Sequence, residues 1–200
     1  MITEDFEPQL KASRSFAWWA FFLKFRFAAF HVMALVGTLY FGVTAEAAAC
    51  CAVLYFVRMF GVTAGYHRYF SHKAFKTSRP FAFFLALLAQ SSGQRGAIWW
   101  ARNHRHHHRY SDKKEDIHSA KHHGFWKSHC GWIFMPEAYT HQNTVSDLER
   151  HRELLFLERY PMTPAIALAL AVYALLGPSG FFFGFCMSTV LLFHGTFTIN

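Results

Sequence analysis

The sequence has few acidic residues and only four cysteines. Only 12 Asp and Glu stand against 20 Lys and Arg, so the net charge is +8 with histidine neutral. The four cysteines form no C-x-x-C motif, which excludes a zinc ribbon and a redox dithiol. Cys50 and Cys51 fall inside an apolar segment, where we expect them to pack as small hydrophobic residues.

Other features are also absent. The polar, acidic start of the chain, Met1 to Pro8, does not resemble a signal peptide, and no internal repeat or long linker is present. No nucleic-acid-binding module is recognisable, and the basic residues lie between membrane-length apolar segments, so we expect no nucleic-acid partner. The positive charge instead suits binding to anionic lipid head groups, to an acidic protein partner or to a polyanionic group on the substrate.

Hydrophobic residues make up 53% of the chain and occur in long blocks. This pattern predicts an all-α membrane protein with one domain, residues 1–200. The four predicted transmembrane helices cover approximately residues 27–43, 47–64, 162–176 and 181–199. Between the second and third, Phe81–Ala89 is apolar but too short to span, and we predict an interfacial or re-entrant helix there.

Positive charge predicts the orientation of these helices. Residues 67–160 carry 15 Lys and Arg, and Lys11 and Arg14 precede the first span. The two short connections, 44–46 and 177–180, carry none. The positive-inside rule therefore places both termini and a His-rich cap of interfacial helices on the cytoplasmic side.

The run from Arg102 to Tyr110 contains four histidines in five positions. A helix turns about 100° per residue, so His104, His107 and His108 share one face while His106 points to the opposite side. Three imidazoles on one face form most of a metal's coordination shell. The alternative is a solvated basic stripe, which would more naturally consist of Lys and Arg.

A second histidine pair, His67 and His72, lies at the end of the second apolar segment. Residues five apart diverge on a regular α-helix. The pair can therefore share a metal only if the helix ends, frays or bulges between them. Both pairs must lie on one side of the membrane to form one site, which is a further reason to expect that Phe81–Ala89 does not cross it.

Three sequence motifs carry a resemblance to a known family. They are GVTAGYHRYFSH (61–72), WWARNHRHHHRYS (99–111) and TFTIN (196–200). Together with the predicted spans, they resemble the integral-membrane fatty-acid desaturases, in particular the acyl-CoA Δ9 branch typified by stearoyl-CoA desaturase. The resemblance implies an O2-dependent oxidoreductase that introduces a cis double bond into a saturated acyl chain at a centre of two iron ions.

The resemblance also implies roles for individual residues. The metal ligands it implies are His67, His72, His104, His107, His108 and, through water, Asn200. Trp100, Arg102 and Asn103 lie beside the ligand face, where they could bind the substrate, although Arg102 could equally bind lipid phosphate. Met59 and Tyr55 recede from His67 in four-residue steps and could form the floor of an acyl tunnel, or simply pack between helices.

The sequence departs from the family pattern at two places. The family has a histidine four residues after the asparagine and a later H-N-x-H-H box, so we expect this sequence to be incomplete and inactive alone. At Asp116-Ile117-His118 many relatives have Asp-Pro-His, which leaves His118 with a packing or supporting role. The remaining histidines are expected at the surface or in packing, and His194 is expected to hydrogen-bond across helices.

Partners and rival functions follow from the same chemistry. The resemblance implies a cytochrome b5-like or ferredoxin-like electron carrier with its reductase, and an acyl-CoA or acyl-lipid substrate. One rival is a membrane di-iron hydroxylase, which would yield an alcohol instead of a double bond. Another is a non-catalytic zinc- or nickel-handling membrane protein, which would need ionisable groups along its later spans. The segments 162–176 and 181–199 have almost none.

Overall fold

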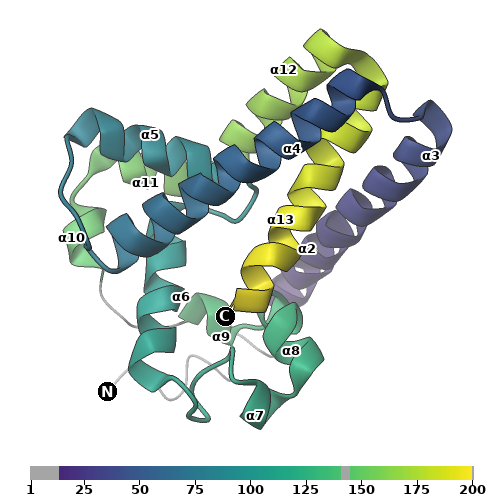
Figure 1. Ribbon diagram of the computed structural model, residues 1–200. Coiled ribbons are helices and arrows are strands. Elements are labelled where there is room, and N and C mark those ends of the chain that lie inside the picture. Colours follow the sequence, from purple (N-terminus) through teal and green to yellow (C-terminus); the bar gives the residue numbers. More distant parts are fainter. Residues whose placement is uncertain (1–13, 141–144, 200) are drawn as a thin grey trace.

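A computed structural model describes residues 14–140 and 145–199 of the chain (Figure 1). The described residues form helices joined by short loops and contain no strand. Three helical stretches are long and apolar enough to cross a membrane: Ala20–Phe41, Ala45–Ser71 and Thr163–Thr198. Many of their large apolar side chains are exposed, and Leu39, Tyr40 and Leu175 are each more than three quarters accessible. Such outward apolar surface is typical of a lipid-facing protein.

These stretches combine α-helices with π-helical turns. The first contains α2 (Arg14–Val32), η1 (Met33–Gly37) and α3 (Thr38–Phe41). The second contains α4 (Ala45–Phe60) and η2 (Gly61–Ser71), and the third contains α12 (Thr163–Ser179), η4 (Gly180–Met187) and α13 (Ser188–Ile199).

The predicted segments 162–176 and 181–199 both lie within the third stretch. The backbone leaves helical geometry at Gly177, which has φ +63°, a conformation that glycine adopts without strain. The chain reverses there, so that η4 packs back alongside α12 and α13 continues towards the other end of the bundle (Figure 1).

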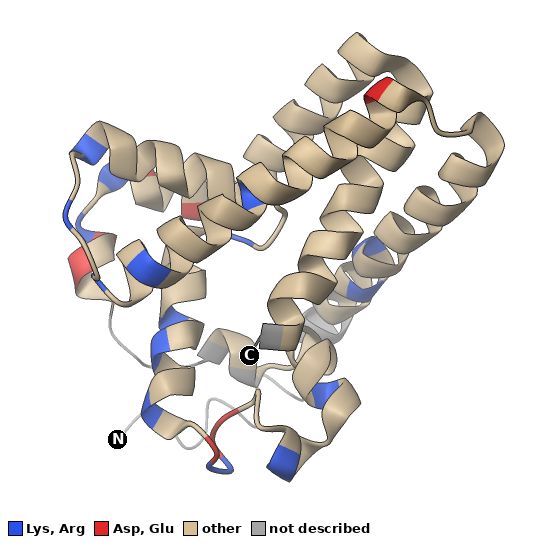
Figure 2. Cartoon of the chain, viewed as in Figure 1, with Lys and Arg blue, Asp and Glu red and all other residues tan. Residues whose placement is uncertain are grey.

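The two turns at the far end of the bundle are tied together. The Ser179 hydroxyl donates to the Gly42 carbonyl at 3.0 Å and accepts the Thr44 N–H at 3.3 Å. Thr44 also caps α4 by accepting the Ala47 N–H at 3.1 Å. Neither turn carries Lys or Arg, whereas basic residues surround the opposite end of the molecule (Figure 2).

The smaller helices lie at that basic end. The segment predicted over 81–89 is the helix α5 (Arg79–Gln90), whose N-cap is Ser78, and it packs against η2. The other elements are α6 (Ala97–Tyr110), α7 (Ala120–His123), α8 (Phe125–His129), η3 (Gly131–Phe134), α9 (Glu137–Thr140), α10 (Ser146–Glu149) and α11 (Arg152–Arg159). Helix α6 descends from the junction of α5 and α11 (Figure 1), and it carries the histidine run.

A fully buried arginine stabilises the contact between α4 and α13. Arg58 donates to the Thr189 hydroxyl at 2.8 Å and the Ser188 hydroxyl at 2.5 Å, and one of its nitrogens lies 3.4 Å from the Ser91 carbonyl. These neutral acceptors satisfy a charge that would otherwise be costly inside a membrane.

Candidate metal centre

The π-helical turn η2 positions the first pair of histidines. Its hydrogen bonds run from residue i to i+5, as in the bond from the His72 N–H to the His67 carbonyl at 3.1 Å. Residues five apart therefore lie one above the other, and the two imidazole rings are 4.6 Å apart between centroids. Of the three alternatives, a helix end, a frayed turn or a bulge, the structure shows the bulge, and it allows the two histidines to converge.

Helix α6 supplies two further histidines one turn apart. The Nε2 atom of His104 lies 3.1 Å from Nε2 of His72 and 3.1 Å from Nε2 of His108. One ring nitrogen from each of His67, His72, His104 and His108 lies within 4.8 Å of the other three. We call these four residues the histidine tetrad. Four imidazoles that converge in this way are a donor set suited to a transition metal.

The tetrad is electrostatically prepared for a cation. Burial and then the neighbouring histidines lower the pKa of His104 to about 2. Burial and adjacent imidazoles also lower the pKa of His108. Both side chains are therefore neutral near pH 7, and each offers a lone pair without first losing a proton. The Trp100 ring stacks on His104, with centroids 4.7 Å apart, and fixes its plane.

His107 lies beside the tetrad and faces a different partner. Its Nδ1 is 2.9 Å from a carboxylate oxygen of the buried Asp116, which also accepts the His118 backbone N–H at 3.0 Å. Burial tends to raise the Asp116 pKa, but these hydrogen bonds outweigh it and the pKa is lowered. An ionised Asp116 fixes the proton of His107 on Nδ1 and leaves Nε2 free to ligate. His118 itself packs on Trp132, with ring centroids 4.3 Å apart.

Two residues of the same run point away from the centre. The Nε2 of His106 lies 3.0 Å from the Glu115 carbonyl, outside the tetrad, as the helical-face argument predicts. Arg102 forms an ion pair with Glu149 at 2.7 Å and does not contribute to the pocket described below. Its predicted substrate contact therefore has no support in the geometry.

Arg105 fixes the two histidine-bearing elements against each other. Its guanidinium donates to the carbonyls of Phe70 and Ser71 at 2.7 and 3.1 Å, at the end of η2. The same group makes a bidentate pair with Asp147 at 2.8 and 2.9 Å, and Lys73 reaches Asp147 at 3.0 Å. This clamp could not be predicted from the sequence, because its parts come from three separate segments.

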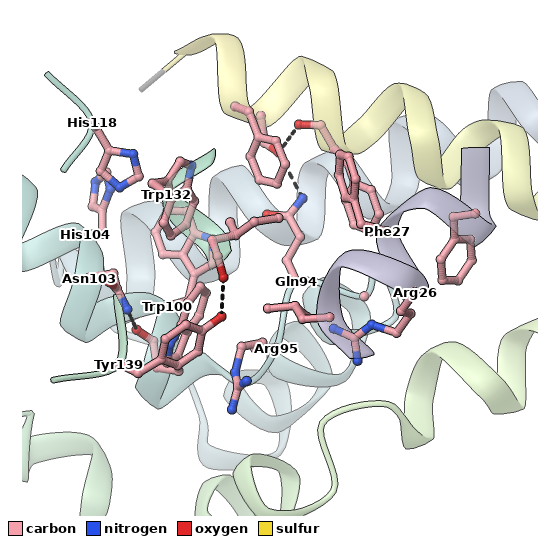
Figure 3. A pocket seen from close by; sticks show the side chains of 18 residues that line it. Arg26, Phe27, Gln94, Arg95, Trp100, Asn103, His104, His118, Trp132 and Tyr139 are labelled. Carbon is pink, nitrogen blue, oxygen red and sulfur yellow. Dashed lines mark hydrogen bonds between the residues drawn. The ribbon is translucent and has the colours of Figure 1, made fainter. Parts of the chain in front are cut away.

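A largely apolar pocket of about 70 Å³ opens beside the tetrad (Figure 3). His104 and Trp100 belong to its wall and connect it to the metal site. Much of the remaining wall is aromatic and comes from α2, η3 and α13: Phe27, Phe30, Trp132, Phe193 and Phe197. An apolar group in this pocket would be shielded from water and would touch the tetrad at His104.

Several polar groups in the pocket wall lack a protein partner. The Asn103 side-chain amide donates to the Trp99 carbonyl at 3.0 Å, but its oxygen is buried without a hydrogen bond to any described residue. The indole nitrogens of Trp99 and Trp132 are in the same state. Gln94, by contrast, is satisfied by the Thr196 hydroxyl at 2.9 Å. Unsatisfied groups in a pocket indicate a ligand with a polar head.

The other predicted tunnel residues lie elsewhere. Met59 and Tyr55 pack against the core, next to Gly195 on α13. A Cβ at Gly195 would approach the Met59 methyl to 3.1 Å and the Tyr55 hydroxyl to 3.2 Å. Neither residue lines the pocket beside the tetrad, and Asn200 lies outside the described residues.

Three other histidines connect the bundle to the cap. His31 Nε2 lies 2.9 Å from His194 Nε2, and His194 Nδ1 lies 2.9 Å from His129 Nε2. The predicted cross-helix hydrogen bond of His194 is confirmed. The contact with His129 on α8 was not predicted, because 65 residues separate the two positions.

Comparison of the sequence with known proteins identifies its family. The profile of the family described as fatty acid desaturase matches residues 44–200. The chain belongs to the fatty acid desaturase family. It is 33% identical over 184 residues to an sn-2 palmitoyl-lipid 9-desaturase of Nostoc, covering 87% of this chain and 62% of that protein.

The match to a probable acyl-CoA desaturase of Schizosaccharomyces pombe has 32% identity over 159 residues, 74% of this chain and 33% of that protein. Human stearoyl-CoA desaturase is 37% identical over 111 residues, 53% of this chain and 31% of that protein. The chain therefore spans between about a third and three fifths of the length of these relatives. The resemblance to the Δ9 branch is confirmed.

Proposed function

We propose that this chain acts in an O2-dependent membrane desaturase that introduces a cis double bond into a saturated fatty acyl chain. The observation that carries the proposal is the contact between the histidine tetrad and the apolar pocket through His104 and Trp100. Oxidation of an unactivated acyl chain requires a metal centre with an apolar pocket next to it.

We assign the metal centre to two iron ions. The tetrad offers neutral imidazole nitrogens at ligand spacing, so it fits a first ion. His107, oriented by Asp116, would contribute to the second, together with Asn200. Bound iron would supply the oxidising power, drawn from O2, that removes hydrogen from a CH2 group. The protein's contribution is to orient the imidazoles and exclude water.

The acyl chain would lie in the pocket, with its methylene groups against the aromatic wall. Trp100 would position the chain at the tetrad, and Asn103 would hydrogen-bond the polar end of the substrate. Met59 and Tyr55 meet Gly195 between α4 and α13 and do not line this pocket, so their proposed role in chain length requires the acyl tunnel to extend beyond the pocket. The printed names of the relatives include acyl-CoA and acyl-lipid desaturases, so both carriers are candidates.

The proposed membrane arrangement has four crossings. The helical segments before and after Gly177 would each cross the membrane, and α5 would lie at the membrane surface. The basic end would face the cytoplasm, with both termini and the His-rich cap. A basic surface around the tetrad would attract an acidic electron carrier, either cytochrome b5-like or ferredoxin-like, supplied by its reductase.

Product and metal analysis test this proposal. The full-length protein that contains this sequence should carry iron and convert a saturated substrate into a cis alkene when an electron donor and O2 are present. The His104→Ala variant should lose both properties. An alcohol as the main product would favour the hydroxylase alternative, and zinc without any oxidised product would favour the metal-handling alternative.

A further inference from the structure

Two large aromatic side chains are exposed on the cap. Phe125 is 61% and Trp126 is 75% accessible, and their ring centroids lie 5.2 Å apart. They begin α8, directly after Gly124, whose φ of +77° turns the chain. Neither ring belongs to the tetrad or lines the pocket. Two adjacent apolar rings are costly to expose to water, so they indicate a surface that meets a partner.

The chain around this aromatic pair is basic. Lys121 is exposed on α7, and Lys127 directly follows Trp126 on α8. The sequence has no Asp or Glu from residue 117 to 136, and Figure 2 shows only basic charge on α7 and α8. Aromatic rings flanked by lysines are typical of an element that lies in a membrane surface. There the rings reach the acyl chains and the lysines reach lipid phosphates.

Contacts with the bundle set the depth of α8. The Nε2 of His129, at the end of α8, lies 2.9 Å from Nδ1 of His194. His194 comes four residues before Thr198, where the third apolar stretch ends, which is about 6 Å along a helix. In the next element, η3, Phe134 packs edge-on against Phe27 of the first stretch, with centroids 5.7 Å apart. Helix α8 therefore lies beside the end of α13 (Figure 1), within the depth of about 5–10 Å to which an interfacial helix buries its apolar face.

Three imidazoles hold α8 at this depth, and we call them the imidazole chain. The Nδ1 of His31 lies 2.7 Å from the Phe27 carbonyl, which can only accept, so Nδ1 carries a proton. In the neutral state, Nε2 of His31 accepts from Nε2–H of His194 at 2.9 Å, and Nδ1 of His194 accepts from Nε2–H of His129. This arrangement needs no charge inside the membrane. Phe125 stacks on His129, with centroids 5.3 Å apart, and so joins the exposed pair to the chain.

We propose that α8 is a membrane-surface anchor: Phe125 and Trp126 insert between the lipid head groups and the acyl chains, and the imidazole chain fixes their depth. This inference rests on the membrane arrangement in the proposed function and not on its metal chemistry. A lipid surface accounts for the rings, the lysines and the depth together, whereas an acidic protein partner would not require α8 to lie beside the apolar stretches. The anchor also holds part of the pocket wall, because Trp132 and Ile133 follow α8 directly.

Fluorescence quenching of the full-length protein in lipid nanodiscs tests this inference. The difference between the wild type and Trp126→Phe isolates the Trp126 emission. Lipids brominated either beside the head group or at the end of the acyl chains quench rings at those two depths. We expect bromine beside the head group to remove most of the Trp126 emission, and bromine at the chain ends to remove much less. Trp132→Phe is the matched control, because Trp132 is buried in the same segment and its emission should be quenched little.

A variant of the imidazole chain tests how the depth is fixed. His194→Leu should release α8, so that the Trp126 emission, measured as the same difference, shifts to the red and is quenched by iodide in the water. His123→Leu is the control, because the Nε2 of His123 bonds to the Lys114 carbonyl and lies outside the chain. Full bromine quenching in His194→Leu would overturn the role of the imidazole chain.

The wild-type measurement alone can overturn the anchor. Trp126 emission that iodide quenches and bromine does not would place the ring in water. Emission that neither agent quenches would mean that protein covers the ring, either another part of the full-length chain or a protein partner. Removal of iron with a chelator should leave the quenching unchanged. A protein without iron or unsaturated product would therefore defeat the proposed function and leave this test intact.

Discussion

Substitution of Gly96 tests how α6, which carries the histidine run, is held in place. Gly96 is the N-cap of α6 and has ordinary extended backbone angles, so alanine is allowed there. A Cβ at this position would nevertheless lie 2.3 Å from the Glu158 carboxylate oxygen and 3.1 Å from the carboxyl carbon. That carboxylate accepts the Trp99 N–H at 3.2 Å and so caps α6 from α11. Gly96→Ala must displace it.

The expected cost has two parts. Loss of a helix cap costs about 1–2 kcal/mol, and a buried carboxylate without its N–H partners adds about 1–3 kcal/mol. Burial already raises the pKa of Glu158, and the N–H groups of α6 only partly offset this rise. We therefore expect Gly96→Ala to lower the free energy of unfolding by about 2–4 kcal/mol and to weaken metal binding through α6.

Denaturant unfolding in detergent, followed by circular dichroism, measures this cost. Gly131→Ala is a matched control, because its Cβ would meet only an ordinary contact at 3.4 Å. In a Glu158→Ala background the clashing carboxylate is gone, so Gly96→Ala should then cost less than about 1 kcal/mol. An unchanged stability in the single variant, or the same loss in both backgrounds, would refute the trans-capping argument.

Three further predictions address other parts of the chain. Arg105 and Lys73 hold the pKa of Asp147 well below its usual range, so the ionised carboxylate stabilises the fold fully above about pH 4 and loses this effect only as pH falls through the lowered pKa of the folded protein. Asp147→Asn should destabilise the protein at pH 7 by about 1–3 kcal/mol, and this difference should shrink progressively as pH falls below about 4 in denaturant unfolding. Asp116→Asn should weaken metal binding about 10–100-fold in titrations, because His107 loses its orienting charge, and unaltered affinity would contradict that role. With Cys130 replaced, cysteines introduced at Phe75 and Glu115 should react with a reagent on the same side of the membrane, and one at Pro178 should react from the other side.

Histidine spacing alone predicted much of the candidate centre. The five-residue gap between His67 and His72 required the helix to end, fray or bulge between them, and η2 is the bulge. The 100° helical turn separated His106 from its neighbours, as observed. These predictions held because both depend on the geometry of a single helix. The helical-face argument placed His107 with His104 and His108, but it could not predict Asp116, whose position depends on the loop after α6.

The roles of charged residues within the apolar segments could not be predicted from the sequence. Lys24 and Arg26 interrupt the hydropathy of the first segment, so its predicted start at residue 27 is seven residues later than that of the apolar helix Ala20–Phe41. Lys24 is exposed on this helix, whereas Arg26 lines the pocket. Arg58 lies within the second apolar segment, and partners from α13 and the loop after α5 satisfy it. Contacts between distant segments set these roles, and local pattern does not encode them.

Iron content per chain in single histidine variants tests the central claim most directly. The full-length protein is purified with each substitution, and iron and zinc are measured against protein. We predict that His67→Ala, His72→Ala, His104→Ala and His108→Ala each lose most of the iron, while His106→Ala retains the wild-type amount, because its ring lies outside the tetrad. Loss of iron in His106→Ala equal to that in His104→Ala, or retention of iron in the four tetrad variants, would contradict the account.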